Sequence, residues 1–309
     1  MKARVRVLVC DPVHEEGIEK LRQSGFEVDV SPAISHEELK RAASNYDALI
    51  VRSRSHVTGD VIEAGKRLKA IGRAGAGLDN VDVKAAEEKG IAVLNTPEAL
   101  ADATAELTIG LMISLARSIP RADRTMKEGK WIKKELVGWQ LRGKTLGVIG
   151  LGNVGERVAR IAKAFGMKVL IRDTKRNHPS PELSKELEAE SVPFREILQR
   201  SDIVTMHVPL TPQTHHMIGE KELQLMKNGA FLVNASRGSV VDERALLEAL
   251  RSGKLGGAAL DVYEVEPPRD LTLVGMPNVV CTPHIGAQTE EAQKAASISI
   301  AEKIVHHFE

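Results

Sequence analysis

The sequence predicts an α/β fold with two doubly wound parallel sheets. Short apolar runs that are typical of buried strands alternate with helical patterns along almost all of the 309 residues, as expected where helices cover both faces of a parallel sheet. A glycine-rich turn, Gly150 to Gly155, lies between one such strand and the helix that follows. The last helical pattern, 290–308, has no obvious packing partner next to this turn. We therefore expect one domain to be inserted into another.

The first third of the chain is predicted to form most of the outer domain. Strands are expected at 5–9, 26–30, 48–51, 68–71 and 91–94. Helices are expected at 14–23, 36–43, 60–67 and 83–89. Gly25 follows the first helix, where a left-handed C-terminal cap favours glycine.

The inserted domain begins with a long helical pattern. It runs from 99 to 117, is interrupted at Pro120 and resumes to 128. Strands are expected at 144–149, 168–173, 203–208, 230–234, 258–262 and 279–281, and 179–190 is interpreted as a charged surface connection. If the final helix crosses back, the outer domain consists of 1–97 and 285–309, and the inserted domain of 98–284.

The composition argues against several classes of partner. The 43 Lys and Arg residues nearly balance 42 Asp and Glu, so neither a nucleic acid nor a membrane surface is expected as a partner. Aromatic residues make up 3% of the chain, too few for base-stacking platforms. Cys10 and Cys281 lie in apolar strand-like runs and are expected to be buried, reduced thiols of a cytoplasmic protein. The most apolar helical stretch, 107–115, is too short to span a bilayer.

The glycine-rich turn has the spacing of a dinucleotide-binding motif. Gly150 permits the tight turn, Gly152 lets the backbone approach a pyrophosphate, and Gly155 allows the helix to pack closely on the strand. The helix N-terminus offers N–H groups to the phosphates. Glycine triplets also occur in ordinary turns, but the apolar run before this one and the helical spacing after it favour a dinucleotide site.

Asp173 is expected to select the cofactor, because it lies about twenty residues after the glycine turn. Its carboxylate can accept hydrogen bonds from the ribose hydroxyls and would repel a 2′-phosphate, so NAD is the expected cofactor. Arg172, Lys175 and Arg176 surround it and leave NADP as the minority alternative.

Polar residues follow several strands of the inserted domain, where open α/β sheets bind their ligands. Arg237 ends the run Asn234-Ala-Ser-Arg237 and can grip a substrate carboxylate through two hydrogen bonds. The alternative is a surface ion pair with Asp242 or Glu243.

His284 follows the last strand, between a proline and Gly286, and histidine titrates near neutral pH, which suits acid–base catalysis. A lone histidine is more often inert, and Asp261 and Glu266 belong to an acidic run of the kind that is usually just solvated. Four further histidines are interpreted as surface residues: His215, His216, His306 and His307. No spacing typical of metal ligands appears, so no metal is expected.

In this order, these motifs resemble the D-isomer-specific 2-hydroxyacid dehydrogenase family over essentially the whole chain. The resemblance includes Arg52-Ser53, Gly72 to Asp82, Asn95-Thr-Pro97, Ala105-Glu106, Lys130-Trp131 and Leu141-Arg-Gly143. It continues with Ser236-Arg237-Gly238, Val241-Asp242-Glu243, Asp261-Val and Thr282-Pro-His284-Ile-Gly286. The family implies a Rossmann dinucleotide-binding domain inserted into a flavodoxin-like substrate domain.

The resemblance also implies roles for individual residues in an NAD-dependent 2-hydroxyacid dehydrogenase. His284 is the acid–base, Glu266 pairs with it and favours its charged form, and Arg237 binds the substrate carboxylate. Asp261 would hold the nicotinamide carboxamide. The cofactor contacts implied are Ala76, Gly150, Gly152, Asn153, Val154, Gly155, Asp173, Val208, Ala235, Ser236, Arg237, Asp261, His284 and Gly286. The substrate contacts implied are Arg52, Ser53, Gly75, Arg237 and His284.

Within the family, the chain looks most like the members that oxidise 3-phospho-D-glycerate to 3-phosphohydroxypyruvate, the first step of L-serine biosynthesis. It departs from them at Arg54-Ser55-His56, where they often have small residues and a lysine, and at Glu98, where they often have asparagine. A carboxylate that points toward a phosphate site would be unfavourable. The chain stops after Glu309, and two interpretations are open: a short form without the C-terminal regulatory domain of many such enzymes, or a chain that has been truncated.

Two alternatives stay open. One is a glyoxylate or hydroxypyruvate reductase with the same three residues, Arg237, Glu266 and His284. The basic cluster Lys130, Lys133 and Lys134 could receive a substrate phosphate from across a subunit interface, whereas in such a reductase it would be a solvated charge run. The other is an NAD-sensing binding protein like the corepressors that share this fold. A homodimer is expected, because helix 101–116 carries apolar residues on more than one face.

Overall fold

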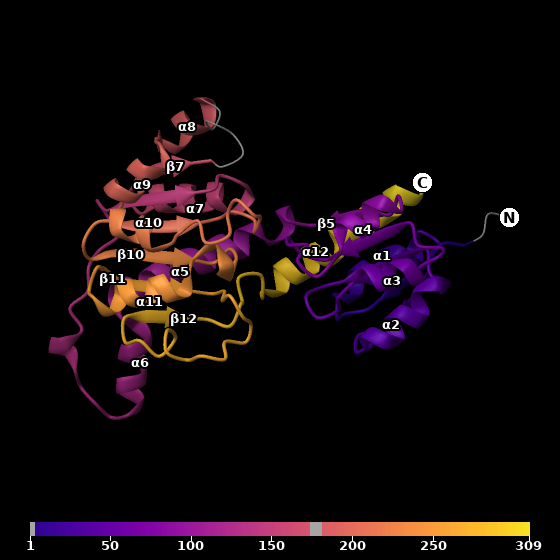
Figure 1. Ribbon diagram of the computed structural model, residues 1–309, viewed down its shortest axis with the longest axis horizontal. Coiled ribbons are helices and arrows are strands. Elements are labelled where there is room, and N and C mark those ends of the chain that lie inside the picture. Colours follow the sequence, from indigo (N-terminus) through magenta and orange to yellow (C-terminus); the bar gives the residue numbers. More distant parts are fainter. Residues whose placement is uncertain (1–3, 174–180) are drawn as a thin grey trace. The chain divides into compact units, whose positions relative to one another are not determined.

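The chain folds into two compact units. The computed structural model describes residues 4–173 and 181–309. The first unit consists of Met1–Ala101 and Ala287–Glu309, and the second, Asp102–Gly286, is inserted between these segments. Each unit is a parallel sheet with helices on both faces (Figure 1). This confirms the predicted α/β fold with two doubly wound sheets.

The first unit has a five-stranded sheet in the order β2-β1-β3-β4-β5, which is the order of flavodoxin-like sheets. Its strands are β1 (Arg6–Val9), β2 (Glu27–Val30), β3 (Ala48–Val51), β4 (Ala70–Arg73) and β5 (Ala92–Asn95). Its helices are α1 (Glu15–Gln23), α2 (His36–Ala42), α3 (Gly59–Ala64), α4 (Val83–Glu88) and α12 (Glu290–Phe308), with short 3-10 helices η1 (Ala43–Asn45) and η2 (Glu98–Leu100).

The last helix of the chain, α12, packs on the sheet of this first unit beside α1. Ile300, Ala301 and Ile304 recur at helical spacing and are completely or almost completely buried against β1, β3 and β4. A Cβ on Gly72 of β4 would lie 2.8 Å from Cγ1 of Ile300, so the helix lies directly on the strand backbone. Helices α2, α3 and α4 cover the opposite face.

The second unit has a seven-stranded parallel sheet in the order β12-β11-β10-β9-β6-β7-β8. Its strands are β6 (Thr145–Ile149), β7 (Lys168–Arg172), β8 (Glu190–Ser191), β9 (Ile203–Met206), β10 (Ala230–Asn234), β11 (Leu255–Leu260) and β12 (Val279–Cys281). Chain order runs outward in both directions from β6 and β9, as in dinucleotide-binding folds.

Helices cover both faces of this second sheet. Its helices are α5 (Ala101–Arg117), α6 (Ile119–Lys127), α7 (Asn153–Ala164), α8 (Pro181–Leu187), α9 (Phe194–Arg200), α10 (Glu220–Leu225) and α11 (Glu243–Arg251), with 3-10 helices η3 (Lys133–Glu135) and η4 (Gly238–Val240). Helices α5 and α7 pack on one face, and α9, α10 and α11 pack on the other.

Three expectations are corrected. The segment expected to be a surface connection, 179–190, contains helix α8, whose Leu187 is 1% exposed in the core. Cys281, at the end of the edge strand β12, is exposed, whereas Cys10 is buried as expected. Helix Glu98–Arg117 is longer than the apolar stretch at 107–115, and by length and composition alone it could cross a membrane. Half of the most apolar part of this helix is buried inside the protein, and helices in protein cores often have the same length and composition.

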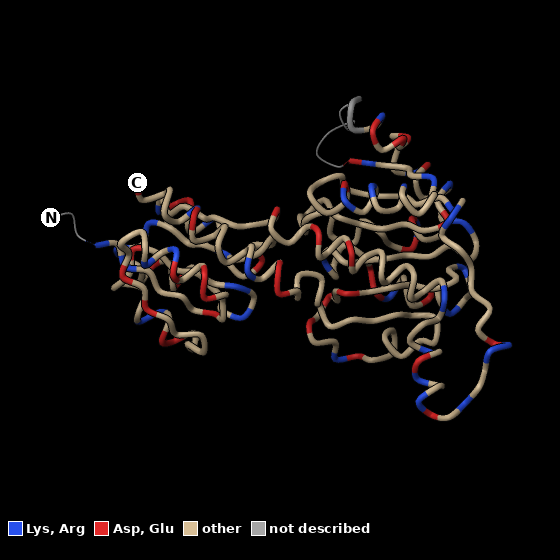
Figure 2. The backbone as a smooth tube through the Cα atoms, turned by 180° about the vertical axis from the view of Figure 1, so that it is seen from behind, with Lys and Arg blue, Asp and Glu red and all other residues tan. Residues whose placement is uncertain are grey.

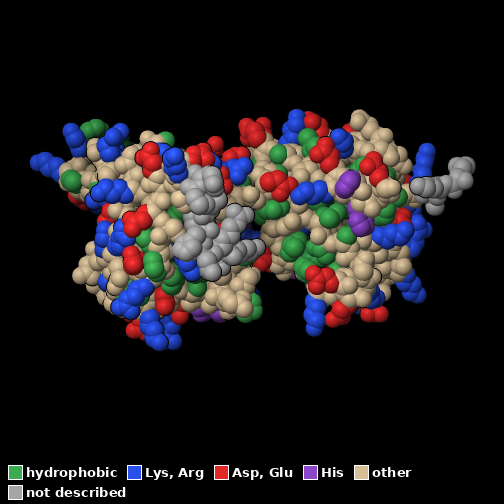
Figure 3. All heavy atoms as spheres, turned by 90° about the horizontal axis from the view of Figure 1, so that it is seen from above, with side chains coloured by type: hydrophobic (Ala, Val, Ile, Leu, Met, Phe, Trp, Pro, Cys, Tyr) green, Lys and Arg blue, Asp and Glu red, His purple; other side chains and the backbone are tan. Residues whose placement is uncertain are grey.

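The surface carries charges of both signs. Lys and Arg alternate with Asp and Glu along both units (Figure 2), and they are interspersed on the face shown in Figure 3. In the second unit, α6 and the segment after it extend away from the sheet (Figure 1). Trp131 and Val137 in that segment are 77% and 88% exposed.

Candidate active site

The predicted site residues of the second unit follow consecutive strands of one parallel sheet. His284 follows β12, Glu266 follows β11, and Arg237 follows β10. Gly150 follows β6, and Asp173 follows β7. Because all these strands are parallel, their carboxyl ends meet at one edge, and the order of the strands reverses between β6 and β9. This reversal is the place where open α/β sheets bind ligands.

The turn between β6 and α7 has the geometry of a pyrophosphate cradle. Gly150 has a φ of 92°, which favours glycine. A Cβ on Gly155 would lie 1.9 Å from the carbonyl oxygen of Gly150, so only glycine fits there. Gly152 caps α7 without a side-chain hydrogen bond, and no described atom lies within 4 Å of the position its Cβ would take. The first N–H groups of α7, from Asn153 and Val154, are therefore available to an anion.

The remaining predicted cofactor residues of this unit line the same sheet edge. Asp173 is 8% exposed at the end of β7. Val208 and Ala235, after β9 and β10, are also buried, and Ser236 is half-buried. These residues fit a dinucleotide laid across the strand ends. Lys175 and Arg176, which kept NADP open, lie outside the described residues.

His284 and Glu266 form a hydrogen-bonded pair. Nδ1 of His284 lies 2.6 Å from Oε2 of Glu266. Burial alone would raise the pKa of Glu266. The pKa is nevertheless lowered, because the carboxylate bonds to His284 and to the N–H of Tyr263 and lies near the charges of His284 and Arg237. The carboxylate is therefore ionised and accepts from Nδ1, which leaves Nε2 to exchange a proton with a substrate.

Asp261 holds the backbone turn that presents His284. The carboxylate is 1% exposed, and it accepts hydrogen bonds from the N–H groups of Ile285 and Gly286, each at 2.8 Å, and from Oγ1 of Thr282 at 2.6 Å. The N–H of His284 donates to the Asp261 carbonyl. His284 has a φ of 52°, which a residue with a side chain rarely adopts without such support. The predicted contact of Asp261 with the nicotinamide carboxamide stays a prediction.

Arg237 is presented by a turn that Asn234 organises. The Asn234 side chain accepts from the N–H and hydroxyl of Ser236, and its amide donates to the carbonyl of Arg237 at 2.9 Å. Nη1 of Arg237 also donates to the Ser236 carbonyl. Sequence reasoning missed this role of Asn234, although an asparagine at the end of a strand before small residues is a known signal for such a turn.

His207 is a second residue that sequence reasoning missed. It follows β9 directly, and its N–H donates to the carbonyl of Ile149 before the glycine turn. Burial lowers the pKa of its imidazole to about 3, so this ring is neutral. Nε2 of His207 shares a hydrogen bond with Thr205 at 3.0 Å. His207 therefore adds no charge to the cofactor cradle, where its backbone carbonyl lies against Gly150.

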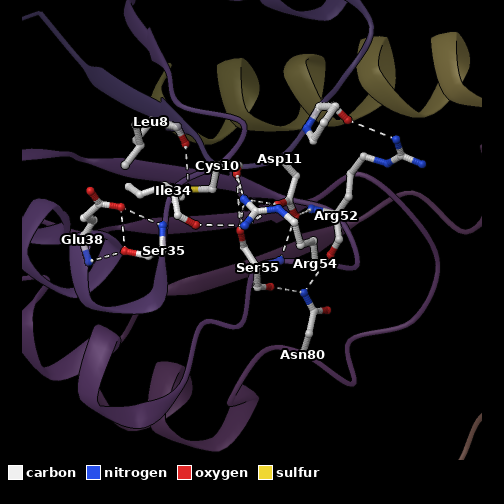
Figure 4. A network of polar contacts seen from close by, with 11 residues as sticks. Leu8, Cys10, Asp11, Ile34, Ser35, Glu38, Arg52, Arg54, Ser55 and Asn80 are labelled. Atoms are coloured by element: carbon white, nitrogen blue, oxygen red, sulfur yellow. Dashed lines mark hydrogen bonds and ion pairs between the residues drawn. The ribbon is translucent and has the colours of Figure 1, made fainter. Parts of the chain in front are cut away.

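In the first unit, a buried carboxylate holds the loop that carries Arg52 and Ser53 (Figure 4). Asp11, at the end of β1, is 1% exposed and accepts from the N–H of Arg52 at 2.6 Å and from the N–H and hydroxyl of Ser55. The amide of Asn80 donates to the carbonyls of Arg52 and Ser55. The loop therefore has a fixed backbone at the carboxyl edge of β3.

The first-unit residues that depart from the family pattern have local partners. Arg54 pairs with Asp11 at 3.0 Å and donates to the carbonyls of Cys10 and Ile34. The carboxylate of Glu98 accepts from Lys303 of α12 at 2.7 Å and from Ser299. Burial would raise the pKa of Glu98, but these two donors lower it. Glu98 is therefore ionised and neutralised by α12, which removes the objection that it presents an unpaired carboxylate.

Gly75 and Ala76 follow β4 at the same edge of the first sheet. A Cβ on Gly75 would lie 1.3 Å from Nη1 of Arg73, so the arginine side chain crosses the glycine directly. Ala76 is exposed, and its carbonyl accepts from Asn95. Within residues 4–173 and 181–309, no group of three or more His, Cys, Asp or Glu side chains could hold a metal ion.

Comparisons with known proteins show the family to which the chain belongs. Residues 109–286 match the family described as D-isomer specific 2-hydroxyacid dehydrogenase, NAD binding domain. The chain is 50% identical, over 97% of its length, to a D-3-phosphoglycerate dehydrogenase of Methanocaldococcus jannaschii, and it spans 57% of that protein. It is 48% identical to a hydroxypyruvate reductase of Thermotoga maritima over 98% of both chains. The structure resembles that of a glyoxylate reductase from Paecilomyes thermophila, with a TM-score of 0.89, 35% identity, and coverage of 98% of this chain and 95% of that one.

Proposed function

Because the chain belongs to the D-isomer-specific 2-hydroxyacid dehydrogenases, we propose that it oxidises 3-phospho-D-glycerate to 3-phosphohydroxypyruvate with NAD. The observation that carries the proposal is the His284–Glu266 pair, at 2.6 Å, at the same sheet edge as the glycine turn. An acid–base beside a dinucleotide cradle is what the oxidation of a hydroxyl group requires. This reaction would stand at the entry to serine synthesis.

The chemistry follows from the positions of the side chains. Arg237 binds the substrate carboxylate and polarises the oxygen on C2. The neutral imidazole of His284 accepts the hydroxyl proton at Nε2, because Nδ1 is held by Glu266. The acceptor for the C2 hydrogen, which leaves as hydride, would be supplied by bound NAD. Glu266 stabilises the imidazolium that forms, and in the reverse direction the same imidazolium returns the proton.

The cofactor is NAD, as the matched domain indicates. Residues of this chain would hold it: the α7 N-terminus beside Gly152 at the pyrophosphate, and Asp173 at the ribose. The buried carboxylate after β7 supports NAD over NADP, because a 2′-phosphate would meet a negative charge there. Ala76, Gly286 and Asp261 remain proposed contacts.

The phosphate of the substrate is the finer part of this proposal. Arg52 is supported as its ligand by the loop geometry, since Asp11 and Asn80 fix the backbone that carries it. Ser53 and Gly75 would complete the substrate contacts. The relative named D-3-phosphoglycerate dehydrogenase and the relative named hydroxypyruvate reductase have similar identities to this chain. Hydroxypyruvate or glyoxylate reduction is therefore the second candidate function.

We further propose a cytoplasmic homodimer. The segment that extends from the second unit carries exposed apolar side chains, namely Ile119, Met126, Trp131 and Val137. Exposed apolar side chains on an extended segment are typical of an interface. Sedimentation velocity tests the dimer, and a single species of monomer mass would contradict it.

Substrate preference is tested by NADH formation at alkaline pH. 3-Phosphoglycerate, D-glycerate and D-lactate are compared, each with NAD and with NADP. We expect the highest kcat/KM for 3-phosphoglycerate with NAD.

Arg52→Gln tests the phosphate contact. It should raise KM for 3-phosphoglycerate by about tenfold or more and leave KM for D-glycerate almost unchanged, since one charge-assisted contact is lost. The matched control is Arg22→Gln, which removes an arginine from an exposed ion pair of the same unit. Preference for D-glycerate would favour the second candidate, and NADH binding without any turnover would favour an NAD-sensing protein.

A further inference from the structure

Two glutamates connect the loop that carries Glu266 to the N-terminus of α11. Glu264 donates its N–H to Oε1 of Glu243 at 2.8 Å. Glu243, the first residue of α11, donates its N–H to Oε1 of Glu264 at 3.0 Å. Each carboxylate thus accepts the backbone N–H of the other residue. We call this reciprocal pair the Glu243–Glu264 brace.

The brace holds the Tyr263–Glu264 peptide, which adjoins the Val262–Tyr263 peptide that contacts Glu266. The N–H of Tyr263 donates to Oε1 of Glu266 at 3.1 Å, and Oε2 of Glu266 accepts from His284. Gly238 closes the other side of this peptide, because a Cβ there would lie 1.9 Å from the carbonyl carbon of Tyr263. The orientation of the Tyr263–Glu264 peptide therefore decides where the Glu266 carboxylate is held.

The surroundings of the brace are strongly charged. Burial and the carboxylates of Glu264, Asp270 and Glu266 raise the pKa of Glu243. His216 faces Glu264, with Nε2 buried and 3.0 Å from Oε1, and it also faces Asp242 at 3.9 Å. On the other side, His284 and Arg237 face Glu266. The N-terminus of α11 and the two backbone N–H groups that the carboxylates accept offset the repulsion that two facing glutamates would otherwise cause.

We propose that Glu243 and Glu264 are positioning residues, whose brace holds the Tyr263–Glu266 backbone so that Glu266 stays on Nδ1 of His284. This inference rests on the proposed acid–base role of His284. Neither glutamate touches substrate or cofactor in this scheme. Their effect is on the strength of the Glu266–His284 contact, and therefore on how readily His284 carries its proton.

The test compares three variants in the direction of hydroxypyruvate reduction. Glu243→Ala removes the acceptor for the Glu264 N–H, whereas Glu243→Gln keeps an oxygen that can accept it. Glu248→Ala is the matched control, since it removes an exposed glutamate of the same helix that pairs only with Arg251 among the described ion pairs. We expect Glu243→Ala to lower kcat by about tenfold with KM and NADH affinity almost unchanged, because a catalytic group is misplaced. Glu243→Gln and Glu248→Ala should stay close to wild type.

The pH profile separates positioning from simple stability. Glu243→Ala should move the midpoint of the reduction profile to lower pH, in the same direction as Glu266→Gln. In the double variant, Glu243→Ala should not move the midpoint of the profile beyond the value for Glu266→Gln alone, because both substitutions act on the contact between Glu266 and His284. A variant that only lowers the melting temperature, with an unchanged profile, would overturn the proposal, as would full additivity in the double variant.

A second readout does not depend on substrate. The imidazole of His284, assigned with a His284→Gln variant, can be titrated by NMR in wild type, Glu243→Ala and Glu243→Gln. A midpoint that falls in Glu243→Ala and is restored in Glu243→Gln supports the brace, and identical midpoints overturn it. If wild type turns over no 2-hydroxy acid, the proposed function fails, while this titration still decides on the brace.

Discussion

Replacement of Glu266 by glutamine tests the acid–base pair most directly. The substitution keeps the size of the side chain and removes its charge 2.6 Å from Nδ1 of His284. An opposite charge within reach of an ionisable group shifts its titration by about 1–3 units. The two side chains are 48% and 37% exposed, so solvent screening favours the low end of that range. We therefore expect the loss of this charge to lower kcat/KM for the reduction by about tenfold at alkaline pH.

The assay is NADH consumption with hydroxypyruvate from mildly acidic to alkaline pH. Reduction needs the imidazolium of His284, so the rate falls as the pH rises. In Glu266→Gln the fall should begin at lower pH than in wild type, so that kcat/KM at alkaline pH is about tenfold lower. Because the pKa of Glu266 is lowered, its carboxylate is ionised at neutral pH, and the wild-type pair is lost only as the pH falls below the ordinary range for glutamate. A uniform loss at every pH, with the midpoint unchanged, would refute the reasoning.

Three further predictions concern the cofactor turn and the substrate loop. Gly155→Ala places a Cβ 1.9 Å from the Gly150 carbonyl oxygen and should weaken NADH binding about tenfold or more, as measured by fluorescence titration. The control Gly110→Ala, whose Cβ would lie in open space on α5, should leave NADH binding unchanged. Asp173→Ser should shift the NADP-to-NAD ratio of kcat/KM toward NADP by roughly tenfold, and an unchanged ratio would remove Asp173 from the ribose site. Asp11→Asn should lower the free energy of unfolding in urea by about 1–3 kcal/mol. It should also raise KM for 3-phosphoglycerate while NADH affinity stays constant. An unchanged KM would show that the loop carrying Arg52 and Ser53 has no part in substrate binding.

The sequence was sufficient for the architecture because strand and turn signals are local. The glycine turn and the alternating apolar runs depend on spacing along the chain. The return of 290–308 was inferred because this helix had no obvious packing partner next to the glycine turn. The helix in 181–187 was missed because its charged sequence has few apolar residues, and among its described side chains, 184–187, it is Leu187 that is buried. Cys281 was misjudged because an apolar run does not reveal that its strand lies at the edge of a sheet.

The candidate site shows the same limit. His284, Glu266 and Arg237 could be named because they lie in recognisable motifs. The role of Asp261, which binds the turn around His284, could not be derived, because it depends on which backbone N–H groups face its carboxylate after folding. Asn234 did carry a turn signal, but the partners of its amide are set by the folded turn. Such contacts follow from tertiary packing and leave no fixed spacing in the sequence.

The return of α12 to the first sheet has a consequence for how the chain is made. Ile300, Ala301 and Ile304 fill one face of a sheet whose strands are all translated before residue 96. On the ribosome, α1 can cover part of that face early, but the part under α12 stays open until the second unit and α12 have been synthesised. Gly72, which is shaped to receive Ile300, meets its partner last. The first unit is thus synthesised first, but its core is completed only when the last helix of the chain is available.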